Sequence, residues 1–219
     1  MDYSKRYRVR PGSRRPLAVC DPRDTAGLGD KQHAAKQLAR GRERLAGLQD
    51  RLYASNTWSL LVIFQAMDGA GKDSTIKHVM SGVNPQGCQV YSFKQPSAED
   101  LDHDFLWRTT KCLPERGRIG IFNRSYYEEV LVTKVHPEII QKQQLPEKYK
   151  DKDVYSRRYQ EINDFERYLA HQGIVTLKFF LNVSKDEQKK RFMERIDRPD
   201  KNWKFSAPGR GGRPRVRAR

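Results

Sequence analysis

The chain has 219 residues, enough for one α/β domain with a sizeable core. Lysine and arginine outnumber aspartate and glutamate by 43 to 27, a formal net charge of +16, so we expect a polyanionic partner or substrate: nucleic acid, an anionic membrane or a phosphate-rich small molecule. The three cysteines are scattered with no C-x-x-C pair, which argues against a disulfide framework or a zinc site. No apolar run approaches the roughly 20 residues of a spanning helix, and the N-terminus lacks a secretory-type apolar segment, so a soluble, cytoplasmic protein is expected.

Residues 1–29 are rich in arginine, proline and glycine and have no hydrophobic periodicity, which predicts a basic arm that is poorly ordered or wraps the domain. Asp30 is expected to cap a helix that runs to about residue 55 and places four leucines on one face. The apolar run over residues 60–64 predicts a buried strand, which is followed by a glycine-containing turn and a helix.

Strands and helices alternate along the rest of the chain. A second strand is expected within residues 84–94 and a helix capped by Ser97 within 97–113. A third strand begins near residue 117 and leads straight into another helix. Residues 154–173 predict an amphipathic helix that presents Tyr155, Tyr159, Ile162 and Leu169, and residues 174–183 predict a fourth strand before a helix with a capping box at Ser184 and Glu187. This alternation predicts a three-layer α/β/α fold with a mostly parallel sheet.

The stretch FQAMDGAGKDSTIKHV, residues 64–79, differs from the standard phosphate loop G-x-x-x-x-G-K-[ST] at Ala66 and Asp73. Its physical parts remain: two glycines allow a tight turn, helix-start N–H groups would face an anion, and Lys72 can reach a terminal phosphate. Asp68 and Asp73 are additional carboxylates, whose presence makes sense if Mg²⁺ lies between them and the phosphates. The alternative is an ordinary strand–turn–helix junction with a solvated lysine.

A second group of polar residues follows the third predicted strand, from Asn123 to Glu128. Ligands of open α/β sheets bind beyond the carboxyl ends of the strands. An amide, a guanidinium and a carboxylate at this position suit a phosphate-loop kinase, where they would hold magnesium and the transferring phosphates. An ordinary helix start is the alternative interpretation.

The helix after the fourth strand carries several basic residues, with Arg191 and Arg195 one turn apart on one face. Kinases of small molecules place an arginine-bearing lid at this point, because the planar guanidinium pairs with two phosphate oxygens and stays charged. A charged helix that is simply solvated is the alternative.

From about residue 56 to 205 the chain resembles the second polyphosphate kinase family. The blocks QAMDGAGKDSTIKHV, NPQGCQVYSFKQPSAEDLDHDFLWRTT, GRIGIFNRSYYEEVLV and RFMERIDRPDKNWKFS lie in family order and spacing. The resemblance implies a phosphate-loop kinase fold, phosphoryl transfer between inorganic polyphosphate and AMP, ADP or ATP, dependence on Mg²⁺ (with Mn²⁺ as a substitute), and a homo-oligomer. We expect no membrane and no specific nucleic acid as partners. In that family the loop carries aspartate at the positions of Asp68 and Asp73. Asn123 and Glu128 depart from the aspartate and asparagine of ADP-preferring relatives and resemble the subclass that phosphorylates both AMP and ADP.

The resemblance also implies roles for individual residues. Those with an implied catalytic role are Asp68, Lys72, Asn123, Arg124, Glu128 and Arg191. Those with implied phosphate or nucleotide contacts are Gly69, Ala70, Gly71, Asp73, Ser74, Lys77, Tyr126, Tyr127, Lys190, Arg195 and Arg198. Asp68 and Glu128 are the implied magnesium ligands. Three aromatic residues either contact a nucleotide base or pack against the protein: Tyr126, Tyr127 and Trp107. For Trp107 we adopt core packing.

Family character stops at about Ser206, where the chain continues as APGRGGRPRVRAR. We therefore expect a kinase domain over residues 30–205, with a lid at about 184–205, and a disordered basic tail over 206–219. Loss of the following strand suggests a frameshift or a truncated gene and predicts lower stability and activity than in full-length relatives.

Two alternatives to a polyphosphate-dependent nucleotide kinase stay open at this point. One is a kinase of the same fold that uses a nucleoside triphosphate as donor. The other is a nucleic-acid-binding protein without catalysis, whose arginine-rich ends would give salt-sensitive binding that survives Lys72→Ala.

Overall fold

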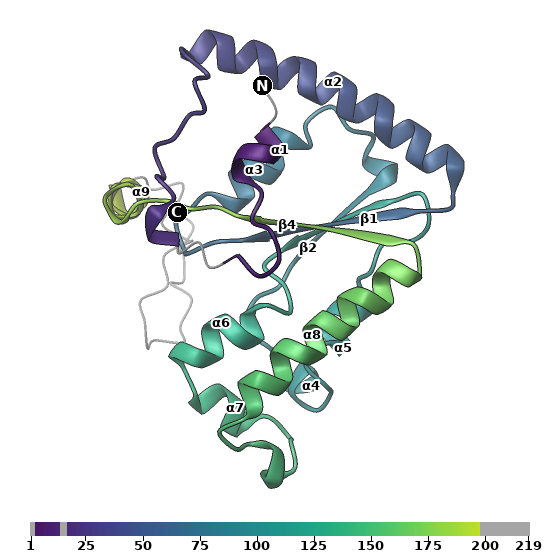
Figure 1. The fold of residues 1–219 in the computed structure, drawn as a ribbon, viewed down its shortest axis with the longest axis vertical. Helices are drawn as coiled ribbons and strands as arrows, with labels where there is room; N and C mark the ends of the chain where they lie inside the picture. The colour runs from purple at the N-terminus through teal and green to yellow at the C-terminus, as the bar shows by residue number, and fades with distance from the viewer. Residues whose placement is uncertain (1–2, 14–16, 198–219) are drawn as a thin grey trace, which may run out of the picture. The chain divides into compact units, whose positions relative to one another are not determined.

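The computed structural model describes residues 3–13 and 17–197, which form two compact units (Figure 1). The larger unit comprises Leu28–Ala66 and Lys72–Leu181. The smaller unit contains the described residues up to Gly27, the segment Met67–Gly71, and the described residues from Asn182 onward. Arg198 and the predicted tail over 206–219 lie outside the described residues.

The larger unit is built on a four-stranded sheet whose strands all pair in parallel. The strands are β1 (Ser59–Gln65), β2 (Cys88–Ser92), β3 (Ile119–Asn123) and β4 (Ile174–Phe180), in the order β2-β3-β1-β4. Each strand is followed in the chain by a helix, so all four carboxyl ends lie at one edge of the sheet. The predicted parallel α/β fold is therefore confirmed.

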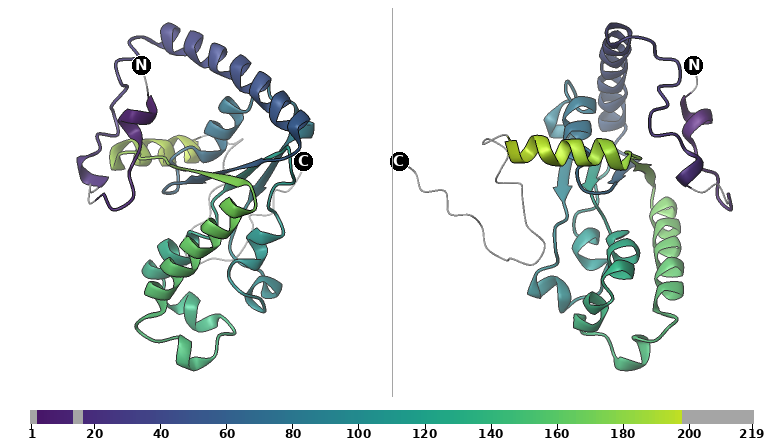
Figure 2. Two further views of the ribbon diagram at one scale, coloured as in Figure 1. Left: turned by 45° about the vertical axis from the view of Figure 1, so that its right-hand side comes forward. Right: turned by 90° about the vertical axis from the view of Figure 1, so that its left-hand side faces the viewer.

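Side chains of the two central strands alternate between two apolar layers, which gives the sheet helices on both faces (Figures 1 and 2). Leu61, Ile63 and Phe122 belong to the layer formed with α6 (Glu128–Val135) and α8 (Val154–His171). Phe64 and Ile121 belong to the layer formed with α2 (Lys31–Ser55) and α3 (Lys72–Val79). Because β1 is buried on both faces, it reads as a continuous apolar run and not as an alternating one.

The helix boundaries expected at Asp30 and Gly173 are confirmed. The Asp30 side chain accepts a hydrogen bond from the backbone N–H of His33 at 2.7 Å and caps α2. Gly173 adopts a left-handed φ of 76° just after α8. On α8, Ile162 and Leu169 are buried as expected, but Tyr159 is exposed, so its assignment to the apolar face is wrong; its ring lies beside Lys134.

The segment from Ser97 contains two short helices where one was predicted. Ser97 and Asp100 form a capping box on α4 (Ala98–Leu101), and α5 (Trp107–Thr110) follows. Between them the carboxylate of Asp104 accepts a hydrogen bond from the backbone N–H of Leu106 at 2.9 Å. Such local side-chain bonds compete with helical hydrogen bonds, which explains the interruption. The remaining short helices are α1 (Tyr3–Tyr7), η1 (Leu17–Val19), η2 (Pro85–Gly87), α7 (Glu138–Lys142) and η3 (Glu147–Tyr149), and the longer α9 is Lys185–Asp197.

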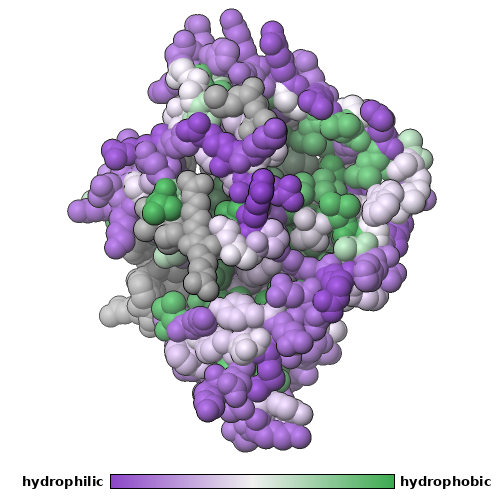
Figure 3. Space-filling model, viewed as in Figure 1, coloured by the Kyte–Doolittle hydropathy of each residue, from purple (hydrophilic) through white to green (hydrophobic). Residues whose placement is uncertain are grey.

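One face of β4 is apolar and exposed. Val175, Leu177 and Phe179 alternate along the strand, and apolar surface is visible between α2 and α8 in Figure 3. β4 pairs with β1 on one side, and no other strand of the described residues pairs with its outer edge. None of the helices in 3–13 and 17–197 is long and apolar enough to cross a membrane.

The described part of the N-terminal arm makes specific contacts within the smaller unit. Arg6 pairs with both carboxylate oxygens of Asp24 at 2.8 Å. The carbonyl of Cys20 accepts a hydrogen bond from the amide of Asn182 at 2.9 Å. The wrapping of the arm around the kinase domain stays a prediction.

Candidate active site

Lys72 lies at the carboxyl end of β1. It is the first residue of α3, and its ammonium donates a hydrogen bond to the carbonyl of Ala66 at 2.9 Å, just beyond the last residue of the strand. The residue is only 9% exposed, yet a backbone carbonyl contacts its charged end. The amine therefore lies in polar surroundings at the edge of the sheet where the phosphate site was predicted, and not in the apolar core.

The loop before Lys72 belongs to the smaller unit and has the turned backbone that its glycines predict. Gly69 and Gly71 adopt φ angles of 80° and 93°, a region in which residues with a Cβ are strained. The N–H of Ala70 donates to the carbonyl of Met67 at 3.2 Å and closes a tight turn. A phosphate loop needs this geometry, because its N–H groups must converge on one anion.

Within the smaller unit, α9 contacts the carbonyl side of this loop. Arg191 donates to the carbonyl of Ala70 at 2.8 Å and its Nε donates to the carboxylate of Glu187 at 2.7 Å. The amide of Gln188 donates to the carbonyl of Asp68 at 2.5 Å. The predicted lid arginine thus contacts the predicted phosphate loop. Gln188 was not among the predicted site residues, although its spacing of three from Arg191 places both on one helix face.

In the larger unit, the start of α3 and the end of β3 meet through one hydrogen bond. The amide nitrogen of Asn123 donates to the carboxylate of Asp73 at 2.7 Å. These residues are 50 positions apart in the chain, and the parallel sheet brings them together at its carboxyl edge. Asp73 lies in the first turn of α3, where a negative charge interacts favourably with the helix dipole.

The backbone at Arg124 turns sharply as the chain leaves β3. Arg124 has a left-handed φ of 66°, and its N–H donates to the carbonyl of Phe64 in β1 at 3.0 Å. Its guanidinium lies 3.3 Å from Oε2 of Glu128, and Oε1 of Glu128 accepts from the amide of Gln65 at 3.1 Å. Arg124 and Glu128, both predicted, are thus brought together with Gln65, which was not predicted. In the sequence, Gln65 is distinguished only as a polar residue at the end of an apolar strand.

Tyr126 and Tyr127 both donate hydrogen bonds to Oε1 of Glu166 on α8, at 2.9 and 2.6 Å. Lys178 of β4 donates to Oε2 of the same carboxylate at 2.5 Å. Burial raises the pKa of Tyr126, and burial together with the bond to Glu166 raises the pKa of Tyr127 to about 12. Tyr126 is 2% exposed, so the structure favours packing over contact with a base for this residue.

The other predicted residues lie on the helices α3, α9 and α5. Ser74 and Lys77 are exposed on α3, Lys190 is exposed on α9, and Arg195 is also part of α9. Trp107 is half-buried and stacks on the ring of His103, with 3.9 Å between ring centroids. Core packing was expected for Trp107, but it joins neither apolar cluster of the described residues.

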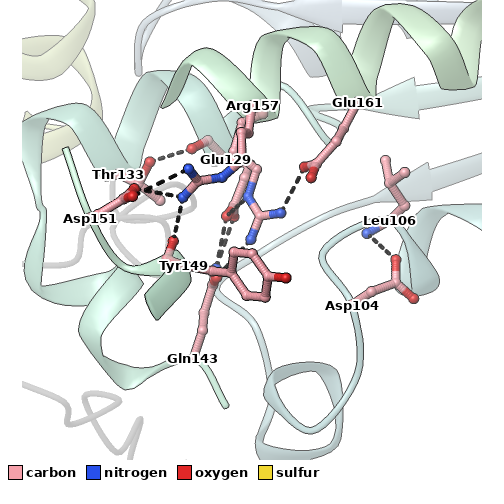
Figure 4. A network of polar contacts seen from close by, with 10 residues as sticks. Asp104, Leu106, Glu129, Thr133, Gln143, Tyr149, Asp151, Arg157 and Glu161 are labelled. Carbon is pink, nitrogen blue, oxygen red and sulfur yellow. Dashed lines mark hydrogen bonds and ion pairs between the residues drawn. The ribbon is translucent and has the colours of Figure 1, made fainter. Parts of the chain in front are cut away.

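A separate polar network joins α6, α8 and Gln143, the residue just after α7 (Glu138–Lys142) (Figure 4). Arg158 donates to the carboxylates of Glu129 and Glu161 at 3.1 and 2.8 Å, and the amide of Gln143 donates to Glu129 at 2.9 Å. Burial raises the pKa of Glu129, and the bonds from Gln143 and Arg158 oppose that rise. Because its side-chain bonds link separate helical segments to one another, we interpret the network as a structural tie between helices.

The geometry agrees with the comparisons to known proteins. The family model described as "Polyphosphate kinase 2 (PPK2)" matches residues 28–210. An "ADP-polyphosphate phosphotransferase" of Rhodopseudomonas palustris is 54% identical over 206 residues, which cover 93% of this chain and 71% of that protein. An "AMP/ADP-polyphosphate phosphotransferase" of Meiothermus ruber is 46% identical over 202 residues, which cover 92% of this chain and 72% of that protein.

Among solved structures, a polyphosphate kinase 2 from Arthrobacter aurescens TC1 superposes with a TM-score of 0.82 at 43% identity. The match covers 93% of this chain and 69% of that one. Family model, sequence relatives and fold agree, and they confirm the predicted phosphotransferase. The chain belongs to the polyphosphate kinase 2 family.

Proposed function

We propose that the protein transfers a phosphoryl group between inorganic polyphosphate and AMP or ADP with the help of Mg²⁺. The family assignment supports polyphosphate as one substrate. The names of the two relatives described above support ADP and AMP as the other substrate.

One observation carries the proposal: the ammonium of Lys72 on the carbonyl of Ala66, directly after a loop with two left-handed glycines. A carbonyl oxygen and a phosphate oxygen are both hydrogen-bond acceptors, so the same ammonium can bind a phosphate oxygen in place of the carbonyl. Phosphoryl transfer requires mainly positioning and charge stabilisation, and these groups supply both.

The remaining chemistry is electrostatic. Lys72 and the loop N–H groups hold the phosphates around the transferred group, and Arg124 neutralises charge that develops in the transition state. The left-handed backbone at Arg124 is a strained conformation of the sort found at functional sites, and it sets the direction in which the side chain leaves β3. Asn123 stays a predicted catalytic residue at the same edge.

The side chains present suit magnesium. Asp68 and Glu128, the predicted ligands, are hard oxygen donors, and Mg²⁺ is usually bound by one or two carboxylates together with waters and substrate phosphates. When bound, the ion would neutralise phosphate charge. Mn²⁺ is expected to substitute for it.

Arg191 is proposed to close over the phosphates as a lid residue, with Lys190, Arg195 and Arg198 as further contacts. Its hydrogen bonds to the loop carbonyls would be exchanged for phosphate oxygens, to which a guanidinium binds more strongly because both partners are charged. Ser74, Lys77 and Tyr127 stay predicted phosphate or nucleotide contacts. The homo-oligomer stays a prediction that light scattering can test.

The test is a reaction without any nucleoside triphosphate. Purified protein is incubated with long-chain polyphosphate, Mg²⁺ and either AMP or ADP, and the products are followed by chromatography. ADP or ATP should form, Lys72→Ala should abolish the product, and Lys152→Ala, a change at an exposed lysine of a connecting turn, should not. Product formation only with a nucleoside triphosphate as donor would contradict the proposal.

A further inference from the structure

Gln65 is a buried polar residue at the end of the central strand β1. It is 7% exposed, and its amide N–H donates to Oε1 of Glu128 at 3.1 Å. The amide oxygen of Gln65 is buried and has no hydrogen-bond donor among the described residues. The orientation of the amide follows from its neighbour, because the reverse orientation would place two oxygen atoms against each other.

Stability alone does not account for a glutamine at this position. The rest of β1 after Ser59 is apolar, and a buried acceptor without a donor destabilises the folded state. An apolar residue of the same size would remove that cost. The hydroxyls of Ser59 and Thr176 are also buried without a hydrogen-bond partner among the residues that the structure describes. Gln65 differs from them because it contacts Glu128.

Glu128 is held at both oxygens. Gln65 donates to Oε1, and Arg124 lies 3.3 Å from Oε2. Arg124 leaves a strand end and Glu128 begins a helix, whereas Gln65 pairs with Phe180 of β4 and its carbonyl accepts a hydrogen bond from the N–H of Leu181 at 2.9 Å. The glutamine is therefore the rigid member of this group, and it restricts the rotation of the Glu128 carboxylate.

We infer that Gln65 is a positioning residue that orients the Glu128 carboxylate for phosphoryl transfer, at a cost in stability. The inference rests on the proposed function, in which Glu128 is a catalytic residue and a magnesium ligand. Residues that orient a metal-binding or catalytic carboxylate typically change activity by about 10–100-fold when they are replaced.

The decisive variant is Gln65→Met, which keeps the volume and removes both the donor and the unpaired acceptor. We expect kcat to fall by about 10–100-fold, the nucleotide KM to change little, and Tm to stay the same or rise. Ser59→Ala is the matched control, since it removes a buried unpaired oxygen at the other end of the same strand. It should leave kcat unchanged. Gln65→Asn, which keeps the amide and shortens the side chain, should retain an intermediate kcat.

A second readout does not depend on turnover. The rise in Tm caused by Mg²⁺ in the presence of polyphosphate, relative to polyphosphate with a chelator, should be smaller in Gln65→Met than in the wild-type protein. If the wild-type protein shows no turnover with polyphosphate, the proposed function fails, while this thermal shift still tests the positioning of Glu128. A lower Tm with kcat within twofold of wild type, or an unchanged magnesium-dependent shift, would overturn the inference and make Gln65 a purely structural tie between β1 and α6.

Discussion

Replacing Lys72 with methionine removes one positive charge from the end of β1 and keeps all but the last atom of the side chain's length. In the ligand-free protein the change deletes the hydrogen bond to the Ala66 carbonyl at 2.9 Å. Losing such a bond costs about 0.5–1.5 kcal/mol of stability. For a chain of this size that cost lowers Tm by about 1–6 °C. A domain that starts from at least about 5 kcal/mol then stays more than about 99% folded at 25 °C.

The effect of Lys72→Met on catalysis should be much larger. Removing one preorganised hydrogen-bond donor that stabilises a charge developing in the transition state typically lowers kcat by about 10²–10³-fold, or about 2.7–4 kcal/mol. The assay is polyphosphate-driven phosphorylation of AMP with saturating Mg²⁺, measured beside a thermal melt of the same sample. Because the folded fraction barely changes, loss of activity reports on the transition state. Retention of more than a tenth of the wild-type rate would refute the assignment of Lys72 to the transferred phosphate.

The other predictions concern stability, pH and salt. Leu61→Ala should lower the free energy of unfolding by about 2–5 kcal/mol in urea, because Leu61 is 0% exposed, whereas Leu177→Ala at 44% exposure should cost less than about 1 kcal/mol; equal costs would contradict the described core. The pKa of Tyr127 is raised from 10.0 to about 12 in the folded state. At a pH between these two values the Tyr127 hydroxyl therefore keeps its proton in the folded state and has lost it in the unfolded state. Stability should therefore fall as pH rises through this window, and Tyr127→Phe should weaken that dependence in alkaline denaturation series. The apparent KM for long-chain polyphosphate should rise steeply with added KCl, since a chain with a net charge of +16 binds a polyanion largely by counterion release; a KM independent of salt would argue against a basic channel.

The parallel fold could be predicted from the sequence because each strand carries its own signal. β1 is a continuous apolar run, and the glycines of the following loop predict the turn that the φ angles of Gly69 and Gly71 confirm. Asp30 predicts the start of α2, because its side chain can accept a hydrogen bond from the first turn of the helix. Each of these patterns lies within a single stretch of sequence, because the burial of one strand and the hydrogen bonds at one helix end depend mainly on neighbouring residues.

Contacts between distant segments could not be predicted in the same way. Gln65 gave no signal beyond its polarity, because its role depends on Glu128, a residue 63 positions away in the chain. The surroundings of Tyr126 depend on Glu166 and therefore on how α8 packs. Tyr159 has the helical spacing of a buried residue and is nevertheless exposed, because the apolar face of α8 is narrower than the spacing alone implies.

The hydrogen bond between Asn123 and Asp73 has a simple electrostatic reason. Two carboxylates at the 2.7 Å that separates the Asp73 oxygen from the Asn123 nitrogen would repel, and one of them would need a proton or a cation. The amide of Asn123 removes this need, because it donates a hydrogen bond to Asp73 directly. A second carboxylate is carried by Glu128, the first residue of α6, where Gln65 and Arg124 contact its two oxygens. The asparagine at position 123 and the glutamate at position 128 therefore form one electrostatic arrangement, in which Asp73 and Glu128 each have their own supporting contacts.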